Sequence, residues 1–204
     1  EGDSFPTEKL ILENVNIHDQ TYAFHNAGFT IANIDTVIIR NSRFSHLGEG
    51  LASIYNCDFL EMSNILVDDV FSFATPYPSG HYLVGLGVDV VDINNVTMAN
   101  LAVEDHSNGP GSVLRLWETA NYLNISSSII RYISETSEFM IMDEPYSTQV
   151  VIDYSNISLP TSSHQFTPAD SAAIDPLFID PDSGDFRLQV ESPCIDAGNP
   201  DPSW

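Results

Sequence analysis

The chain has 204 residues, of which 43% are hydrophobic, and its 29 acidic and 6 basic residues give a formal net charge of −23. This excess of carboxylates excludes nucleic acid and an anionic membrane surface as partners, because both are anionic themselves. Solubility, or adaptation to salty surroundings, explains the acidity better than a specific cationic ligand does. No apolar run is long enough to span a bilayer, so we expect no direct membrane insertion.

Between residues 10 and 160, six segments repeat one pattern of apolar and polar residues. Each has apolar residues four and two positions before a central residue, and another three positions after it. The central residues are Asn14, Asn41, Asn64, Asn95, Ser127 and Tyr154. They lie 27, 23, 31, 32 and 27 residues apart, which is typical of a solenoid with one short unit per turn.

The alternation slips by one residue at each central position. Side chains of a strand point to opposite faces with period two, so the apolar set stays inside only if the chain bends there. Asn suits such a bend because it adopts the left-handed backbone conformation more readily than most residues. We predict a structural turn ladder, with amides that hydrogen-bond between coils, at Asn14, Asn41, Asn64 and Asn95. Alternatively, these residues mark turns without contacting one another.

The repeat resembles that of the right-handed parallel β-helix family, in which each coil has three short strands and an Asn often marks a tight turn. The resemblance covers residues 10–160 and implies an all-β solenoid of about six coils, closed by a C-terminal cap. We expect residues 1–160 to form the repeats, and residues 161–204 to form a linker and a capping segment. The boundary follows a shift after Leu159 to a segment rich in Pro, Ser, Thr and Ala. The inward positions should be buried, namely Ile39, Met62, Ile93, Ile125 and Ile152.

One expected strand carries a candidate ligand-binding surface. If Leu114 and Leu116 point inward, Arg115 and Trp117 point outward together. An exposed Trp beside an Arg can support a sugar ring, and Tyr82 can extend this platform. We therefore predict carbohydrate binding at Arg115, Trp117 and Tyr82. The alternative is that Trp117 packs beneath the loop of residues 104–112.

Three motifs mark the C-terminal part: Asp175-Pro-Leu-Phe-Ile-Asp180-Pro, Gly184-Asp-Phe-Arg-Leu-Gln and Ser192-Pro-Cys-Ile-Asp-Ala-Gly198. They resemble the tail that follows β-helix repeats in many bacterial secreted and surface-anchored proteins. The resemblance implies an extracellular or outer-surface location, and a chain that is part of a longer exported protein. From the residues themselves, we expect Leu177 and Phe178 to plug the open end of the coil stack.

Within this tail, Asp180, Asp182 and Asp185 lie close together around Gly184. Hard oxygen ligands at alternate positions are what Ca²⁺ prefers, so these three residues form a predicted calcium site. The alternative is a turn in which the Asp side chains accept backbone N–H groups. Neither the six His residues nor the two Cys residues show the spacing of metal ligands.

Enzymes of the resembled family cleave acidic polysaccharides by lyase chemistry or hydrolyse them with paired carboxylates. The sequence shows no cation beside a carboxylate across coils. The doublets Asp68-Asp69 and Asp143-Glu144 are sequence neighbours, which point to opposite faces of a strand. We therefore expect no catalytic residue. The predicted function is a structural, adhesive or glycan-binding module, with a polysaccharide or another surface protein as partner. The alternative is a polysaccharide lyase or glycoside hydrolase that acts on an acidic polysaccharide.

Overall fold

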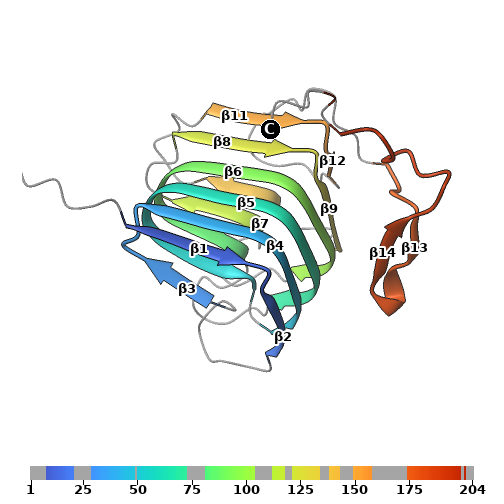
Figure 1. Ribbon diagram of the computed structural model, residues 1–204, viewed down its shortest axis with the longest axis horizontal. Helices are drawn as coiled ribbons and strands as arrows, with labels where there is room; N and C mark the ends of the chain where they lie inside the picture. Colours follow the sequence, from blue (N-terminus) through green and yellow to red (C-terminus); the bar gives the residue numbers. More distant parts are fainter. Residues whose placement is uncertain are drawn as a thin grey trace, which may run out of the picture.

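The computed structural model describes residues 8–20, 29–48, 50–72, 81–103, 112–117, 121–133, 138–142, 149–157, 174–198 and 200. A 12-stranded sheet with parallel pairings winds into a β-solenoid (Figure 1). Its strands are β1 (Lys9–Glu13), β2 (Asn16–Gln20), β3 (Phe29–Ala32), β4 (Thr36–Leu47), β5 (Ala52–Ser72), β6 (His81–Val103), β7 (Ser112–Trp117), β8 (Tyr122–Ser126), β9 (Ile129–Ile133), β10 (Glu138–Met142), β11 (Gln149–Asp153) and β12 (Asn156–Ile157). The described part of the chain contains no helix with the length and apolarity needed to cross a membrane.

The solenoid has about three turns, so the predicted count of about six coils is wrong. Each copy of the sequence repeat corresponds to one strand segment on the same face of the solenoid. The six copies align on that face in the order β1, β4, β5, β6, β8 and β11. Among the described strands, only β4, β5 and β6 continue around corners as single strands (Figure 1). The three short strands expected in each coil are therefore merged in the middle, where β5 and β6 run over 21 and 23 residues.

Residues with left-handed backbone angles form three corners. The first corner contains Asn33, Asn56 and Gly87, with φ between 52° and 64°. The second corner contains the six central residues of the repeat, with φ between 49° and 58°: Asn14, Asn41, Asn64, Asn95, Ser127 and Tyr154. The third corner contains Asp19, His46, Asp69 and Asn100, with φ between 50° and 59°. We call the face between the first and second corners the front face, and the face between the second and third corners the side face. The rear face joins the third corner to the first.

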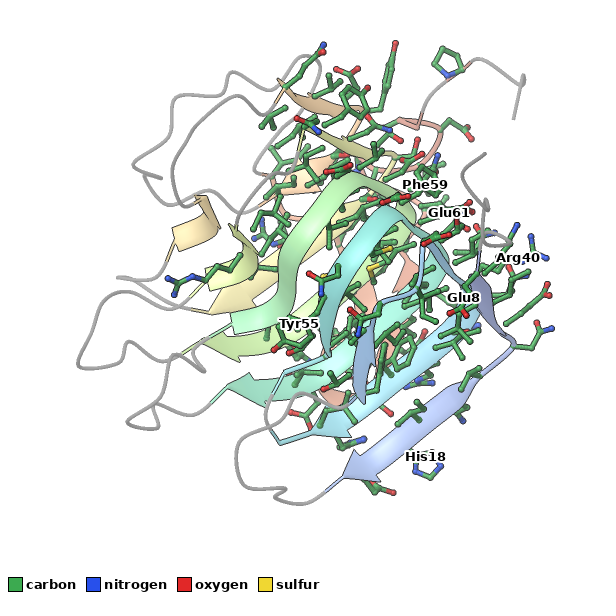
Figure 2. The ribbon with its side chains drawn as sticks, turned by 90° about the vertical axis from the view of Figure 1, so that its left-hand side faces the viewer. Glu8, His18, Arg40, Tyr55, Phe59 and Glu61 are labelled. Atoms are coloured by element: carbon green, nitrogen blue, oxygen red, sulfur yellow. The ribbon has the colours of Figure 1, made fainter. Side chains whose placement is uncertain are left out.

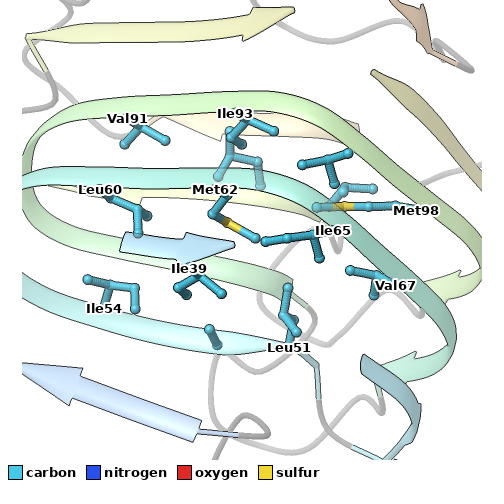
Figure 3. Close-up of a cluster of buried hydrophobic side chains, with 14 of the residues drawn as sticks. Ile39, Leu51, Ile54, Leu60, Met62, Ile65, Val67, Val91, Ile93 and Met98 are labelled. Atoms are coloured by element: carbon cyan, nitrogen blue, oxygen red, sulfur yellow. The ribbon is translucent and has the colours of Figure 1, made fainter. Parts of the chain in front are cut away.

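The interior is a column of aliphatic side chains. Ile39, Met62, Ile93, Ile125 and Ile152 are each at most 3% exposed, which confirms the predicted inward set. Figure 3 shows Ile39, Met62 and Ile93 one above another in successive crossings of the front face. Their burial supplies the main stabilising free energy of the fold, because each removes most of an aliphatic side chain from water.

Side chains at and beside the second corner link neighbouring coils. The Asn64 amide donates to Asn41 Oδ1 at 3.2 Å, and the Asn95 amide donates to Asn64 Oδ1. The next corner residue is Ser127, which has no amide, so this amide-to-amide chain ends at Asn95. One position further on, Ser128 Oγ accepts the backbone N–H of Val96 at 3.1 Å.

The C-terminal segment lies along the side face and does not cover the open end of the stack, so the predicted plug formed by Leu177 and Phe178 is wrong. It contains the antiparallel strands β13 (Phe178–Asp180) and β14 (Asp185–Leu188), joined by the 3₁₀ turn Pro181–Ser183. Asn100 donates to the Pro181 carbonyl at 3.0 Å, and Asn156 donates to the Ile174 carbonyl at 2.8 Å. Because these two Asn residues belong to different coils, the segment runs across the stack. The predicted boundary at residues 160 and 161 lies outside the described residues.

Candidate functional site

One cleft lies between the C-terminal segment and the side face, and we call it the tail cleft. It has a volume of about 620 Å³. From the solenoid it is lined by Asn95, Thr97, Ser127, Ser128, Ile129, Tyr154, Ser155 and Asn156. From the C-terminal segment it is lined by Ile174, Phe186, Arg187, Leu188, Pro193, Cys194, Ile195, Ala197 and Gly198. The lining combines aliphatic side chains with amides, hydroxyls and two aromatic rings, and none of these lining residues is Asp or Glu.

The wall formed by the C-terminal segment is shaped by the β13–β14 hairpin. Phe178 and Phe186 pack edge to face with ring centroids 5.3 Å apart. Arg187 bonds to both carboxylate oxygens of Asp185, at 2.6 Å and 2.8 Å, and this pairing lowers the pKa of Asp185 to about 2. The one cation lining the tail cleft is therefore already paired.

A second cleft, the front groove, lies on the front face beside the second corner and has a volume of about 550 Å³. It is lined by Glu61, Ser63, Asn64, Asp92, Asn94, Asn95 and Ser127. Asn95 and Ser127 line both clefts, so the two meet at the point where the amide chain of the second corner ends. Figure 2 shows Glu61 on the outer side of the solenoid, next to Phe59.

The two carboxylates of the front groove stand side by side. Glu61 and Asp92 are register partners on the adjacent strands β5 and β6, which places their backbones about 4.7–4.9 Å apart. Ser63 Oγ donates to Glu61 at 3.0 Å, and the Asn124 amide donates to Asp92 at 2.9 Å. Both donors are neutral. The two residues are not adjacent in the sequence, so doublets of acidic residues do not reveal this pair, but alignment of the six copies puts both three positions before the corner.

A different carboxylate lies beneath the hairpin. Asp68 is 4% exposed, and Arg43 Nη2 from the neighbouring coil lies 3.6 Å from its Oδ2. Burial raises the pKa of Asp68, while Arg43 opposes that rise. A Cβ added to Gly184 would lie 3.4 Å from Arg43 Nη2 and 3.5 Å from Asp68 Oδ2, so the hairpin closely covers the pair. The side face thus does hold a cation beside a carboxylate across adjacent coils, but this pair is covered.

The predicted sugar platform lies on the rear face, away from both clefts. Leu114 and Leu116 are buried and Arg115 is half-buried, as the alternation predicts. Strand β7 pairs with the start of β6, where Val84 is the register partner of Arg115. The side chains of Trp117 and Tyr82 lie outside the described residues, as does the loop of residues 104–111 that could cover Trp117. Carbohydrate binding at Arg115, Trp117 and Tyr82 therefore stays a prediction.

The predicted calcium ligands have other partners in the hairpin. Ser183 Oγ donates to Asp180 at 2.8 Å, Asp185 is bonded to Arg187, and Asp182 is exposed in the 3₁₀ turn. Within the described part of the chain, no three His, Cys, Asp or Glu side chains are grouped so that they could hold a metal ion. Calcium at Asp180, Asp182 and Asp185 stays a prediction, and binding would have to compete with the Arg187 ion pair.

Comparison with protein families, with curated proteins and with solved structures finds no match.

Proposed function

We propose that the chain is a carbohydrate-binding module of an exported bacterial protein, built as a right-handed parallel β-helix. The observation that carries this proposal is the tail cleft, whose size suits one or two sugar rings. Amides and hydroxyls can hydrogen-bond to sugar hydroxyls, and Tyr154 and Phe186 offer rings for apolar sugar faces. The resemblance of the C-terminal motifs to secreted proteins supports the location outside the cell. An adhesive or structural role on the cell surface would depend on the same binding of carbohydrate in the tail cleft.

Among the described residues that line the tail cleft there is no carboxylate, which favours binding over hydrolysis at that position. A charge of −23 also disfavours acidic polysaccharides, because a polyanionic ligand would be repelled. Neutral or cationic glycans are therefore the better candidates.

The test is a glycan array, followed by isothermal titration calorimetry with the strongest ligand. Replacing Tyr154 by Ala should weaken binding by about tenfold or more, because a ring that stacks on the ligand is lost. The matched control is Tyr55→Ala, since Tyr55 is also half-buried but lies on the rear face (Figure 2). Equal binding by both variants would remove the tail cleft as the site.

A second candidate is a glycoside hydrolase, favoured by the register pairing of Glu61 and Asp92. Retaining glycosidases hold two carboxyl groups about 5–5.5 Å apart, which adjacent strands can provide. A lyase that needs a cation beside its base has less support. Arg43 and Asp68 are covered by the hairpin, and the other pair of an Arg and a carboxylate from adjacent coils among the described residues, Arg40 with Glu13 at 3.2 Å, lines neither cleft. A reducing-end assay tests for this hydrolase activity. Turnover that vanishes in Glu61→Gln and in Asp92→Asn would establish a hydrolase, and no turnover with any bound glycan would exclude it.

A further inference from the structure

We propose that the tail cleft recognises the acetamido group of an N-acetylated hexosamine, so that the ligand is a neutral glycan with N-acetylhexosamine units. This inference rests on the proposed function, because it assigns a sugar class to the tail cleft. Three features of the described lining residues support it: a buried acceptor without a partner, exposed aliphatic side chains beside it, and the lack of an unpaired charge.

The buried acceptor is the side-chain amide of Asn156, which lines the tail cleft and is 6% exposed. Its nitrogen donates to the Ile174 carbonyl at 2.8 Å and to Cys194 Sγ at 3.1 Å, and both of these residues also line the cleft. Its Oδ1 is buried and has no hydrogen-bond partner among the described residues. A buried acceptor without a donor costs free energy, so a ligand N–H or O–H that reaches Oδ1 would be bound favourably.

Strand pairing fixes Asn156 on the solenoid side of the cleft. The residue lies on β12, which pairs with β9, and its neighbour Ile157 is buried. The two groups that contact its amide nitrogen, by contrast, belong to the C-terminal segment. A small outward shift of this segment would therefore open Oδ1 to the cleft and leave the acceptor in place.

Exposed aliphatic side chains lie beside this acceptor. Ile174 and Ile195 line the tail cleft and are 44% and 43% exposed. Ile174 supplies the carbonyl that binds the Asn156 amide, and Ile195 directly follows Cys194, so both side chains originate close to that amide. In an acetamido group, one carbonyl carbon separates the N–H donor from a methyl group. Such a group can donate to Oδ1 and cover apolar surface of the isoleucines at once.

The charges of the cleft disfavour ionised sugars. Arg187 is the one charged residue among the described lining residues, and it is bonded to Asp185 at 2.6 Å. A free amino group would lack a carboxylate there, and a uronate would lack a free cation. A plain hexose is neutral and can donate to Oδ1, but it has no methyl group for the isoleucines. An N-acetylhexosamine has both, and its carbonyl oxygen can accept from the hydroxyl of Thr97 or Tyr154.

The experiment is calorimetry at high salt with linear tetramers of the same linkage, made of N-acetylglucosamine, N-formylglucosamine, glucosamine or glucose. The N-acetylglucosamine tetramer should bind most tightly. The N-formyl tetramer keeps the N–H but lacks the methyl group, so it should bind about fourfold more weakly. The glucose tetramer lacks both groups and should bind about tenfold more weakly or worse.

The double variant Ile174→Ala/Ile195→Ala tests the contact with the methyl group. It should reduce the preference for the N-acetyl over the N-formyl tetramer to less than about twofold. The matched control is Ile179→Ala/Val190→Ala, which removes exposed aliphatic side chains of the same segment that lie outside both clefts and should keep the full preference.

The side-chain amide resonances of Asn156 report on the hydrogen bond. In isotope-labelled protein they should shift on titration with the N-acetylglucosamine tetramer, while those of Asn121, which is exposed outside both clefts, should not. Binding that leaves the Asn156 resonances unmoved would contradict the proposed contact.

The outcomes separate the inference from the proposed function. Equal affinity for the N-acetylglucosamine and glucose tetramers would overturn the acetamido site and leave carbohydrate binding intact. Tightest binding of the glucosamine tetramer, or selection of a deoxy sugar on the glycan array, would overturn N-acetylhexosamine as the sugar class. If no tetramer binds but the array yields another glycan, only the inference fails. If the array yields none, the proposed function fails as well.

Discussion

The coils and the C-terminal segment are held in place by different forces. In the coils, aliphatic side chains such as Ile39 and Met62 are fully buried and long strands are paired along their length. In the C-terminal segment, polar contacts dominate, such as Asn100 to Pro181 and Asn156 to Ile174. Among the described residues, four of the five large hydrophobic side chains that remain exposed lie in this segment: Ile174, Ile179, Val190 and Ile195.

Folding of the coils therefore depends on different contacts from docking of the C-terminal segment. The solenoid gains its stability from burial that the C-terminal segment does not provide, so the segment can loosen while the coils stay folded. The tail cleft lies between the two parts, and a ligand bound there should hold the segment against the side face.

Met62→Ala should lower the free energy of unfolding of the solenoid by about 2–5 kcal/mol, because it leaves a cavity in the middle of the column. Ile179→Ala, in the exposed part of the hairpin, should change it by less than about 0.5 kcal/mol. Urea unfolding of both variants measures the contrast. Similar losses in the two variants would mean that the hairpin belongs to the cooperative core.

Asn156→Ala should release the C-terminal segment from its docked position. The Asn156 amide donates to the Ile174 carbonyl and to Cys194 Sγ at 3.1 Å, so docking should lose about 1–3 kcal/mol. Hydrogen exchange should quicken in residues 174–198 and stay unchanged in β4 and β5. The control Asn121→Ala alters an exposed amide elsewhere. Faster exchange throughout the coils would contradict independent docking.

Gly184→Ala should weaken docking by about 1–2 kcal/mol. Gly184 has a φ of 76°, which an L-residue adopts at a cost, and the new Cβ would meet Arg43. Gly198→Ala is the control, since the φ of Gly198 lies outside that region. Exchange rates in β13 and β14 report the effect, and equal rates in both variants would show that the turn carries no strain.

Docking should strengthen modestly as the pH falls from neutral. Burial beneath the hairpin raises the pKa of Asp68 above its ordinary value of 3.8, so the docked state binds a proton more readily than the undocked state. The added stability is complete below 3.8 and is lost as the pH rises through the docked pKa. Arg43 and His46 lower the pKa of this carboxyl, while Asp69 raises it.

Asp185 behaves in the opposite sense. Its pKa is lowered to about 2 by Arg187 on the same strand, so this pair stabilises the hairpin itself and its contribution is lost only as the pH falls below 3.8. Above that value, Asp68 should therefore dominate the pH dependence of exchange in β13 and β14, after correction for intrinsic rates. Asp68→Asn should flatten the profile. A profile that is identical in this variant would assign the effect to another group.

The solenoid could be predicted from the sequence because its physical causes are local and repeated. Alternation fixes which side chains are buried, and the phase slip at Asn41, Asn64 and Asn95 marks the second corner. The first and third corners were missed because residues of different types fill them, such as Gly87 and His46. The number of turns was overestimated because one repeated face does not establish a complete coil.

The clefts could not be predicted in the same way. The C-terminal segment docks through single amides to backbone carbonyls, and no periodic pattern in the sequence reports where such contacts form. The pairing of Glu61 with Asp92 depends only on register, so the aligned copies contained it. The expected platform at Arg115 and Trp117 came from alternation alone, which gives the direction of a side chain but not what covers it.

The most direct test of carbohydrate binding in the tail cleft is hydrogen exchange with and without a saturating oligosaccharide identified on the array. We predict slower exchange in residues 174–198 and around Ser127 and Asn156, with no change in β7 or the start of β6. Protection confined to β7 and the start of β6 would place the sugar on the rear face and contradict the account, as would a bound sugar that protects neither region.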